Sequence, residues 1–138
     1  MTGGFLAIPP GGLLFGLGID VVEAPRIRRL LERLPRAYAR LFSEQERAYC
    51  DDFADPFPRY AERFAAKEAV GKALGIGIIG FVWRDIEVLS GGKPQIALHG
   101  DVARIAAHLG VTRVEVSLSH TGGMAYAVAA ALKEDADG

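Results

Sequence analysis

The sequence predicts a single α+β domain, and its pattern of apolar residues carries that prediction. Segments with apolar residues at helical spacing alternate with short apolar or alternating segments, which are typical of strands. A Thr-Gly-Gly turn joins the last two strand segments and favours a hairpin, so the sheet should be mainly antiparallel. The predicted order is one strand, three helices, two strands, one helix and two strands, with the sheet packed on helices.

The first half of the domain begins with a short apolar run at residues 13–20 (LLFGLGID), which predicts a buried strand that ends in a carboxylate. Pro25 suits the first turn of a following helix. Ser43 and Glu46 have the spacing of a capping box, which predicts that a further helix begins there. The apolar stripe of the first helix consists of Ile27, Leu30, Leu31 and Leu34.

The second half begins with a long helix over residues 59–77, which ends on glycine. Asp101 starts a shorter helix, and Gly110 ends it. The predicted strands lie within residues 83–89, 91–98, 112–120 and 124–133, the second of them after a glycine turn.

Length and charge exclude several classes of protein. With 138 residues, 50% of them hydrophobic and 24% charged, the chain fits one soluble globular domain. The net charge of -1 gives no overall basic field of the kind that nucleic-acid binding needs. No stretch reaches the length of a membrane span, and the lone Cys50 excludes an intrachain disulfide. We therefore expect a cytoplasmic protein with neither nucleic acid nor membrane as a partner.

The ends of the chain differ in composition from its middle. We expect residues 1–12 to be a flexible N-terminal extension, residues 13–133 to form the single domain, and residues 134–138 to be a frayed acidic tail. The apolar start has no basic segment, and prolines and glycines interrupt it, so it does not match a signal peptide.

The predicted long helix carries the most informative charges of the chain. They are Arg59, Arg63, Lys67, Glu68 and Lys72, set among alanines. Alanine favours helix and takes little space, so such a helix could hold a charged guest, for example a metal-bound phosphate. The alternative is an ordinary solvated helix with i,i+4 pairs such as Glu68 with Lys72.

Asp20 closes the first predicted strand, so its carboxylate lies where the strand leaves the core. It could cap the following helix, or it could bind a metal. Carboxylate oxygens suit Mg²⁺, which commonly takes one or two carboxylates together with substrate phosphates. Glu68 would supply the second carboxylate if the long helix packs against the end of the first strand.

Positive charge is concentrated in residues 26–40, which hold six arginines and one acid, Glu32. The arginines on a face separate from the apolar stripe are Arg26, Arg29, Arg33 and Arg36. This face indicates an acidic partner or a phosphate, and the alternative is a solubilising surface.

Two familiar motifs are rejected because of their context. Residues 75–80 match G-x-G-x-x-G, but a dinucleotide-binding loop follows a strand and opens a helix, whereas this segment follows a helix. We interpret it as a helix end and a tight turn. Ser119 and His120 are neighbours in a predicted strand and point to opposite faces, so they cannot act as a catalytic pair.

Six segments occur together in the order of one known family. They are GIDVVEAPRI (18–27), FSEQE (42–46), RFAAKEAVGKALGIGI (63–78), DIEV (85–88), GKP (92–94) and VSLSHT (116–121). They resemble the holo-[acyl-carrier-protein] synthases, the small trimeric 4′-phosphopantetheinyl transferases. The resemblance covers nearly the whole chain, and the combination of G-I-D with R-F-A-A-K-E-A is its specific part.

The resemblance implies the fold of these transferases and a homotrimer with active sites at subunit interfaces. It implies Mg²⁺-dependent transfer of 4′-phosphopantetheine from coenzyme A to a serine of apo acyl carrier protein, a step of fatty acid biosynthesis. The products would be holo carrier protein and adenosine 3′,5′-bisphosphate.

The family's functional positions match named residues of this chain. Asp20 and Glu68 would hold Mg²⁺ and act in catalysis together with Lys72. The carrier protein, which is acidic, would dock on Arg26, Arg29 and Arg33. The coenzyme A site would be lined by Arg63, Lys72, Gly75, Gly77, His120 and Thr121, several of them from the neighbouring subunit.

The chain departs from the family pattern at a few positions, and other functions stay open. Ile76 stands where threonine is usual, and Ser43 stands where threonine is commoner. One alternative is a transferase dedicated to polyketide or peptide synthetase carriers. Another is a homologue that binds coenzyme A without catalysis, against which the intact Asp20, Glu68 and Lys72 argue.

Overall fold

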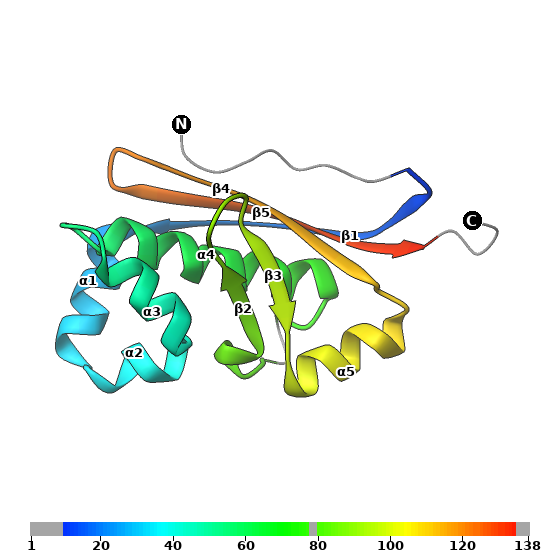
Figure 1. Cartoon of the computed structure of the whole chain (residues 1–138), viewed down its shortest axis with the longest axis horizontal. Coiled ribbons are helices and arrows are strands. Elements are labelled where there is room, and N and C mark those ends of the chain that lie inside the picture. The colour runs from blue at the N-terminus through cyan, green and yellow to red at the C-terminus, as the bar shows by residue number, and fades with distance from the viewer. Residues whose placement is uncertain (1–9, 78–79, 135–138) are drawn as a thin grey trace.

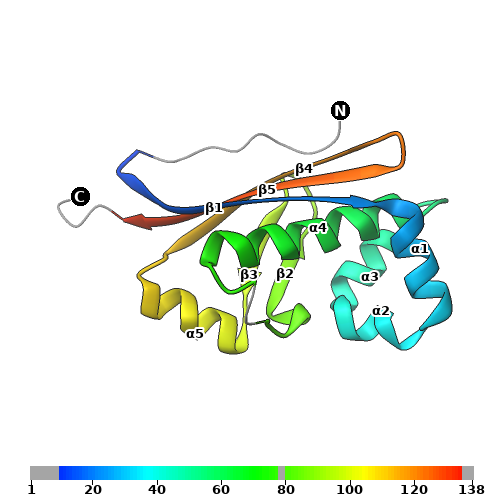
Figure 2. The same ribbon diagram turned by 180° about the vertical axis from the view of Figure 1, so that it is seen from behind.

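A computed structural model describes residues 10–77 and 80–134 of the chain. A long three-stranded sheet covers one side of a long helix, and shorter helices and a hairpin lie on the other side (Figure 1 and, from behind, Figure 2). A 3₁₀ turn at Trp83–Asp85 precedes the hairpin. The elements are β1 (Gly12–Glu23), α1 (Ala24–Arg33), α2 (Arg36–Leu41), α3 (Glu44–Asp51), α4 (Phe57–Leu74), β2 (Ile86–Leu89), β3 (Gln95–Leu98), α5 (Gly100–Leu109), β4 (Arg113–Thr121) and β5 (Met124–Glu134).

The strand pairings within the described residues are all antiparallel, as the sequence predicted. The long sheet has the order β1–β5–β4, and β2 pairs with β3. The Thr-Gly-Gly segment forms the predicted hairpin, in which Thr121 pairs with Met124. β1 is longer than predicted because its pairing with β5 continues from Asp20 to Glu23. The predicted extension and tail fall largely on residues 1–9 and 135–138, which lie outside the described residues.

The first helix ends earlier than its apolar stripe predicts. α1 stops at Arg33, and Leu34 has φ -126° and ψ 79°, which is not helical. Pro35 follows, and the residue before a proline is disfavoured in the helical region. Leu34 is consequently 55% exposed, and its predicted burial is wrong. After the proline the chain forms α2, a six-residue helix that the predicted order lacks.

Glycines in β1 let α4 lie directly against the sheet. An added Cβ at Gly18 would collide with the carbonyl oxygen of Ala69, and one at Gly16 would collide with that of Ala73. The helix ends at Leu74, before the predicted end, because Gly75 takes the left-handed conformation with φ 77°. The glycine motif is thus a helix end, as predicted, although its residues 78–79 lie outside the described part.

The opposite face of the long sheet is apolar and open. Leu17, Ile19 and Val21 alternate along β1 with the glycines that face α4, and all three are exposed. Tyr126 of β5, which pairs with Val21, is exposed as well. Among the described helices, none combines the length and the apolar character that crossing a membrane requires.

Candidate active site

The charged residues predicted to act in catalysis meet where β1 lies against α4. The side chain of Asp20 is 18% exposed, and its Oδ1 accepts a hydrogen bond from Lys72 Nζ at 3.2 Å. Lys72 Nζ also donates to the carbonyl oxygen of Ile19 at 2.9 Å. Glu68 lies one helical turn before Lys72 and is half-buried. We call the side of α4 that carries Glu68 and Lys72, together with Asp20 of β1 that faces it, the carboxylate flank.

The environment of Glu68 on this flank disfavours the charged form of its carboxyl. Burial raises the pKa of the Glu68 carboxyl, the negative charge of Asp20 raises it further, and Lys72 opposes both. Two carboxylates that share a site resist ionising together, and a cation between them removes that cost. Carboxylate oxygens are the ligands that a hard cation such as Mg²⁺ prefers. The donor set therefore fits the metal that the family resemblance implies.

Two carboxylates would leave most positions around such a cation to other ligands. Within residues 10–77 and 80–134, no group of three or more histidine, cysteine, aspartate or glutamate side chains could hold a metal. Mg²⁺ takes near-octahedral coordination and is often bound through one or two carboxylates plus substrate phosphates and water. This geometry suits a site where metal and phosphate bind together.

The predicted glycines lie beside the exposed lysine at the end of α4. Gly75 and Gly77 are both exposed, and an added Cβ at Gly77 would lie 3.8 Å from Lys72 Cγ. The backbone of both glycines is accessible to a ligand because glycine has no side chain of its own. Ile76, between the glycines, is buried in the core.

Two further predicted residues lie on the other side of α4. A helix turns by about 100° per residue, so Arg63 and Lys72, nine residues apart, point in opposite directions. Arg63 is buried; its Nη2 donates to Ser90 Oγ at 2.7 Å, and its guanidinium lies 4.3 Å from the centre of the Tyr49 ring. His120, near the end of β4, is half-buried on this same side. We call this side of α4 the arginine flank.

The structure adds to the arginine flank two residues that the predicted site lacked. Arg59 Nη1 lies 3.2 Å from His120 Nδ1 and 3.3 Å from its Nε2. Glu62 is buried, and its Oε2 lies 3.3 Å from His120 Nδ1. Their spacing in the sequence could have indicated these two residues, because positions 59, 62 and 63 lie on one face of a helix. Thr121, also predicted for the coenzyme A site, follows at the exposed end of β4.

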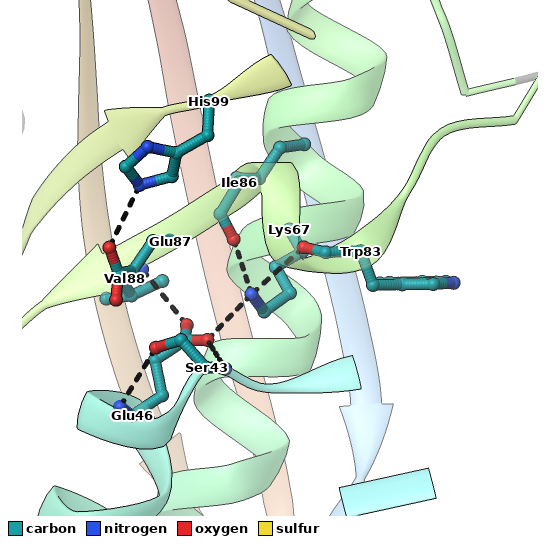
Figure 3. Close-up of polar contacts among 8 residues, drawn as sticks. All are labelled: Ser43, Glu46, Lys67, Trp83, Ile86, Glu87, Val88 and His99. Carbon is teal, nitrogen blue, oxygen red and sulfur yellow. Dashed lines mark hydrogen bonds and ion pairs between the residues drawn. The ribbon is translucent and has the colours of Figure 1, made fainter. Parts of the chain in front are cut away.

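Lys67 is one of the charged residues predicted on this helix, and all the hydrogen-bond donors of its side chain are used within the protein (Figure 3). Its Nζ donates to Glu46 Oε1 at 2.9 Å, to the Trp83 carbonyl oxygen at 3.1 Å and to the Ile86 carbonyl oxygen. An ammonium has three donors, so none is left for a ligand. Burial lowers the pKa of Lys67, and Glu46 opposes that shift. Of the charges that the sequence places on this helix, Lys67 therefore serves the packing of the protein.

The predicted docking arginines, Arg26, Arg29 and Arg33, are exposed on α1. Arg36 lies beyond the break at Pro35, on α2, and so does not continue their face. Between α1 and α2 there is a groove of about 630 Å³. Its apolar lining includes Leu30 and Leu34, and its basic lining consists of Arg36, Arg40 and Arg84.

Known proteins match both the sequence and the fold. Residues 16–131 match the model of the 4′-phosphopantetheinyl transferase superfamily. A holo-[acyl-carrier-protein] synthase of Anaeromyxobacter dehalogenans is 49% identical over 120 residues, which are 83% of this chain and 93% of the relative.

Solved structures of the same kind superpose on most of the chain. The holo-[acyl-carrier-protein] synthase of Neisseria meningitidis gives a TM-score of 0.77 at 32% identity, over 86% of this chain and 98% of that one. That of Helicobacter pylori, in complex with coenzyme A, gives 0.72 at 31% identity, over 83% and 98%. The chain belongs to the 4′-phosphopantetheinyl transferase superfamily and, within it, to the holo-[acyl-carrier-protein] synthases. The predicted fold class and enzyme class are thus confirmed.

Proposed function

We propose that the chain transfers 4′-phosphopantetheine from coenzyme A to a serine of an apo acyl carrier protein in a Mg²⁺-dependent reaction, and releases adenosine 3′,5′-bisphosphate. The observation that carries the proposal is that Asp20 accepts a hydrogen bond from Lys72 and lies near enough to Glu68 to raise its pKa, in a chain of the transferase family. Coenzyme A in the Helicobacter pylori relative supports the choice of substrate.

Each residue of the carboxylate flank would have its own role in the reaction. Asp20 and Glu68 would hold Mg²⁺, which offsets the charge of the pyrophosphate and stabilises the leaving phosphate. The side chain of Lys72 is 49% exposed, so it can turn from Asp20 to a phosphate oxygen. Gly75 and Gly77 would let the substrate approach the backbone next to Lys72.

We infer that two copies of the chain complete one active site, as in a homotrimer. The coenzyme A residues Arg63 and His120 lie on the arginine flank, on the side of α4 away from Lys72. One copy therefore presents its two groups of functional residues in different directions, and a neighbouring copy can bring the missing group to each site. The open apolar face of β1 supports self-association, because a contiguous exposed apolar surface is typical of a protein contact.

We infer that the carrier protein docks on α1 and on the groove beside it. Arg26, Arg29 and Arg33 offer exposed positive charge to an acidic partner, which raises the encounter rate more than the intrinsic affinity. The groove between α1 and α2 adds both apolar and basic lining residues. Comparison of rates with purified carriers of fatty acid, polyketide and peptide synthesis would identify the preferred one.

The experiment that tests the reaction is mass spectrometry of an apo-carrier incubated with the protein, coenzyme A and Mg²⁺. The proposal expects a mass gain of one phosphopantetheine, which disappears when a chelator removes the metal. Binding of coenzyme A without any mass gain on a panel of apo-carriers would instead favour a non-catalytic homologue.

A further inference from the structure

The arginine flank contains a buried carboxylate to which the proposed mechanism gives no role. Glu62 is 3% exposed, and three basic groups surround it. Its Oε1 lies 3.7 Å from Arg59 Nη1 and 3.7 Å from Arg63 Nη1, and its Oε2 lies 3.3 Å from His120 Nδ1. The basic groups alone could bind an anion such as a phosphate, and a negatively charged carboxylate among them would oppose that binding. The position of Glu62 therefore calls for another explanation.

The contacts of His120 determine which form of the ring fits the cluster. A neutral imidazole has one N–H donor and one acceptor nitrogen. If Nδ1–H donates to Glu62 Oε2, then Nε2 is the acceptor on the ring for Arg59 Nη1, which lies 3.3 Å from Nε2 and 3.2 Å from Nδ1. If the ring takes up a proton, both of its nitrogens become donors, and Arg59 Nη1 loses its acceptor on the ring. An anion that accepts from both Nε2–H and Arg59 Nη1 would remove this conflict.

The cluster also has room and an unused donor for such an anion. Among the described residues, Arg63 Nε is buried without a hydrogen-bond partner, which is unusual for a buried polar atom. A cavity of about 110 Å³ lies there, several times the roughly 30 Å³ that one water occupies in the liquid. Its lining includes Tyr49, Arg59, Glu62, Arg63 and Ser90, and His120, which is not in the lining, adjoins it through its contacts with Arg59 and Glu62.

We propose that Glu62 is a positioning residue that prepares His120 to take up a proton when a phosphate group of coenzyme A binds between His120 and Arg59. Glu62 holds Nδ1–H in place and favours the charged ring, while Nε2–H and Arg59 donate to the same phosphate. Binding of the phosphate and binding of the proton then strengthen each other reciprocally. The inference rests on the proposed function, because it takes coenzyme A as the ligand.

Whether protons are taken up or released on binding distinguishes a proton on His120 from a proton on the phosphate. In the part of the chain that the structure describes, the charged groups in contact with the ring are Arg59 and Glu62 from α4, and the cluster is bordered by Arg63 from α4 and Tyr49 from α3. A phosphate monoester titrates near pH 6, and a cationic site would make it release a proton on binding. An imidazole that becomes charged gives net uptake instead. Uptake measured above pH 7 therefore cannot come from the phosphate.

Calorimetric titration of the full chain with coenzyme A, in buffers of different ionisation enthalpy, measures this proton directly. At pH 7.5 we expect uptake of roughly half a proton or more per coenzyme A bound. Where one whole proton is taken up, affinity should rise on the order of tenfold for each unit that the pH falls.

Three variants assign the proton to its residue. His120→Gln should abolish the uptake, and Glu62→Gln should reduce it at least to about half, because an amide does not stabilise a charged ring. The matched control is His108→Gln on the exposed face of α5, which should leave the uptake unchanged. Circular dichroism would establish that each variant is folded.

The choice of ligand identifies the phosphate and separates this inference from the proposed function. Uptake that disappears with dephospho-coenzyme A would support the proposal and assign the 3′-phosphate, whereas uptake that persists would support it with the pyrophosphate as the anion. Coenzyme A that binds and is used for transfer without proton uptake, or with uptake unchanged in His120→Gln, would overturn the inference and leave the proposed function standing. No binding of coenzyme A at all would overturn both.

Discussion

Lys67 and Lys72 lie five residues apart on α4 and differ in almost every physical respect. Lys67 is fully buried, and its three donors are used by Glu46 and two carbonyl oxygens. The side chain of Lys72 is 49% exposed and contacts one carboxylate and one carbonyl oxygen. A charge with all partners inside the protein can hold structure but cannot accept a ligand, whereas a half-exposed charge can exchange its partners.

The carboxylates show the same contrast. Glu46 Oε1 accepts from Ser43 N and from Lys67, and its Oε2 accepts from Val88 N at 3.0 Å (Figure 3). Glu46 therefore joins α3, α4 and β2 in one buried network. Glu68, next to Lys67 in sequence, has a raised pKa because it is partly buried near Asp20. The buried network ties α4 to α3 and β2 through Lys67, the residue that precedes Glu68.

The largest expected effect separates the carboxylate flank from ordinary surface acids. Asp20→Ala and Glu68→Ala should each lower the transfer rate at least about 10²–10³-fold, because the metal would lose one of its two protein ligands. The matched control is Glu23→Ala, an exposed acid at the end of the same strand, which should stay within about twofold. Folded Asp20→Ala protein with near-normal turnover would show that the carboxylate flank is not the site.

A mixing experiment shows whether the two flanks of α4 work in the same copy. Glu68→Gln and His120→Gln should each be weakly active alone, since each lacks one group of functional residues. If sites form between copies, hybrid oligomers made by refolding the two variants together should regain activity, because some sites then contain neither substitution. The transfer rate of the mixture against its composition measures this. A mixture no more active than the two separate variants would mean that each copy builds its own site.

The two lysines should respond oppositely to the same substitution. Lys67→Met leaves Glu46 buried without its cation and should cost about 3–5 kcal/mol of the free energy of unfolding. Lys72→Met should change stability by less than about 1 kcal/mol, since exposed ion pairs contribute little, yet it should lower the transfer rate. Denaturant unfolding gives the free energy of unfolding of each variant, and the transfer assay gives its transfer rate. Equal losses of stability would contradict the distinction between a structural lysine and an available one.

Local signals in the sequence were sufficient for much of the fold. The capping box at Ser43 and Glu46 forms as predicted, and Gly75 and Gly110 end their helices. These features depend on a few neighbouring residues, so the spacing of residue types determines them. The break at Pro35 was equally local, but the regular spacing of leucines across it concealed the end of α1.

The site was harder to predict because it depends on contacts between distant segments. The sequence indicated that Asp20 could meet Glu68, and the close approach at Gly18 makes this possible. It could not show that Lys67 would be used by Glu46, since that partner lies 21 residues away on another helix. Lys67 and Lys72 look alike in a charge pattern, and only the tertiary packing separates them.

Salt should distinguish exposed charges from the buried network. The transfer rate at low carrier concentration should fall on the order of tenfold as salt rises from about 0.05 to about 0.5 M, because the proposed docking on Arg26, Arg29 and Arg33 would be screened. The Arg33→Gln variant should be slower at low salt and should lose less on addition of salt. Arg104→Gln on α5 makes the same charge change away from α1 and serves as the control. A rate independent of salt would remove the docking face from the proposal.

The smallest expected effect lies in the pH dependence of stability, where two glutamates should act in opposite directions. The pKa of Glu68 is raised by burial, so the metal-free folded protein binds its proton more readily than the unfolded chain; this contribution to stability falls as the pH rises above the ordinary value of 4.5. The pKa of Glu87 is lowered, chiefly by a hydrogen bond from Ser43 and also by His99. Its contribution to stability is therefore present above pH 4.5 and is lost as the pH falls.

Relative to the parent protein, Glu68→Gln should therefore gain stability between pH 5 and pH 7, and Glu87→Gln should lose stability over the same range. Thermal unfolding from pH 4 to pH 7 in the presence of chelator measures both differences in stability. If the stability difference changed with pH in the same direction for both variants, the two carboxyls would not have opposite environments.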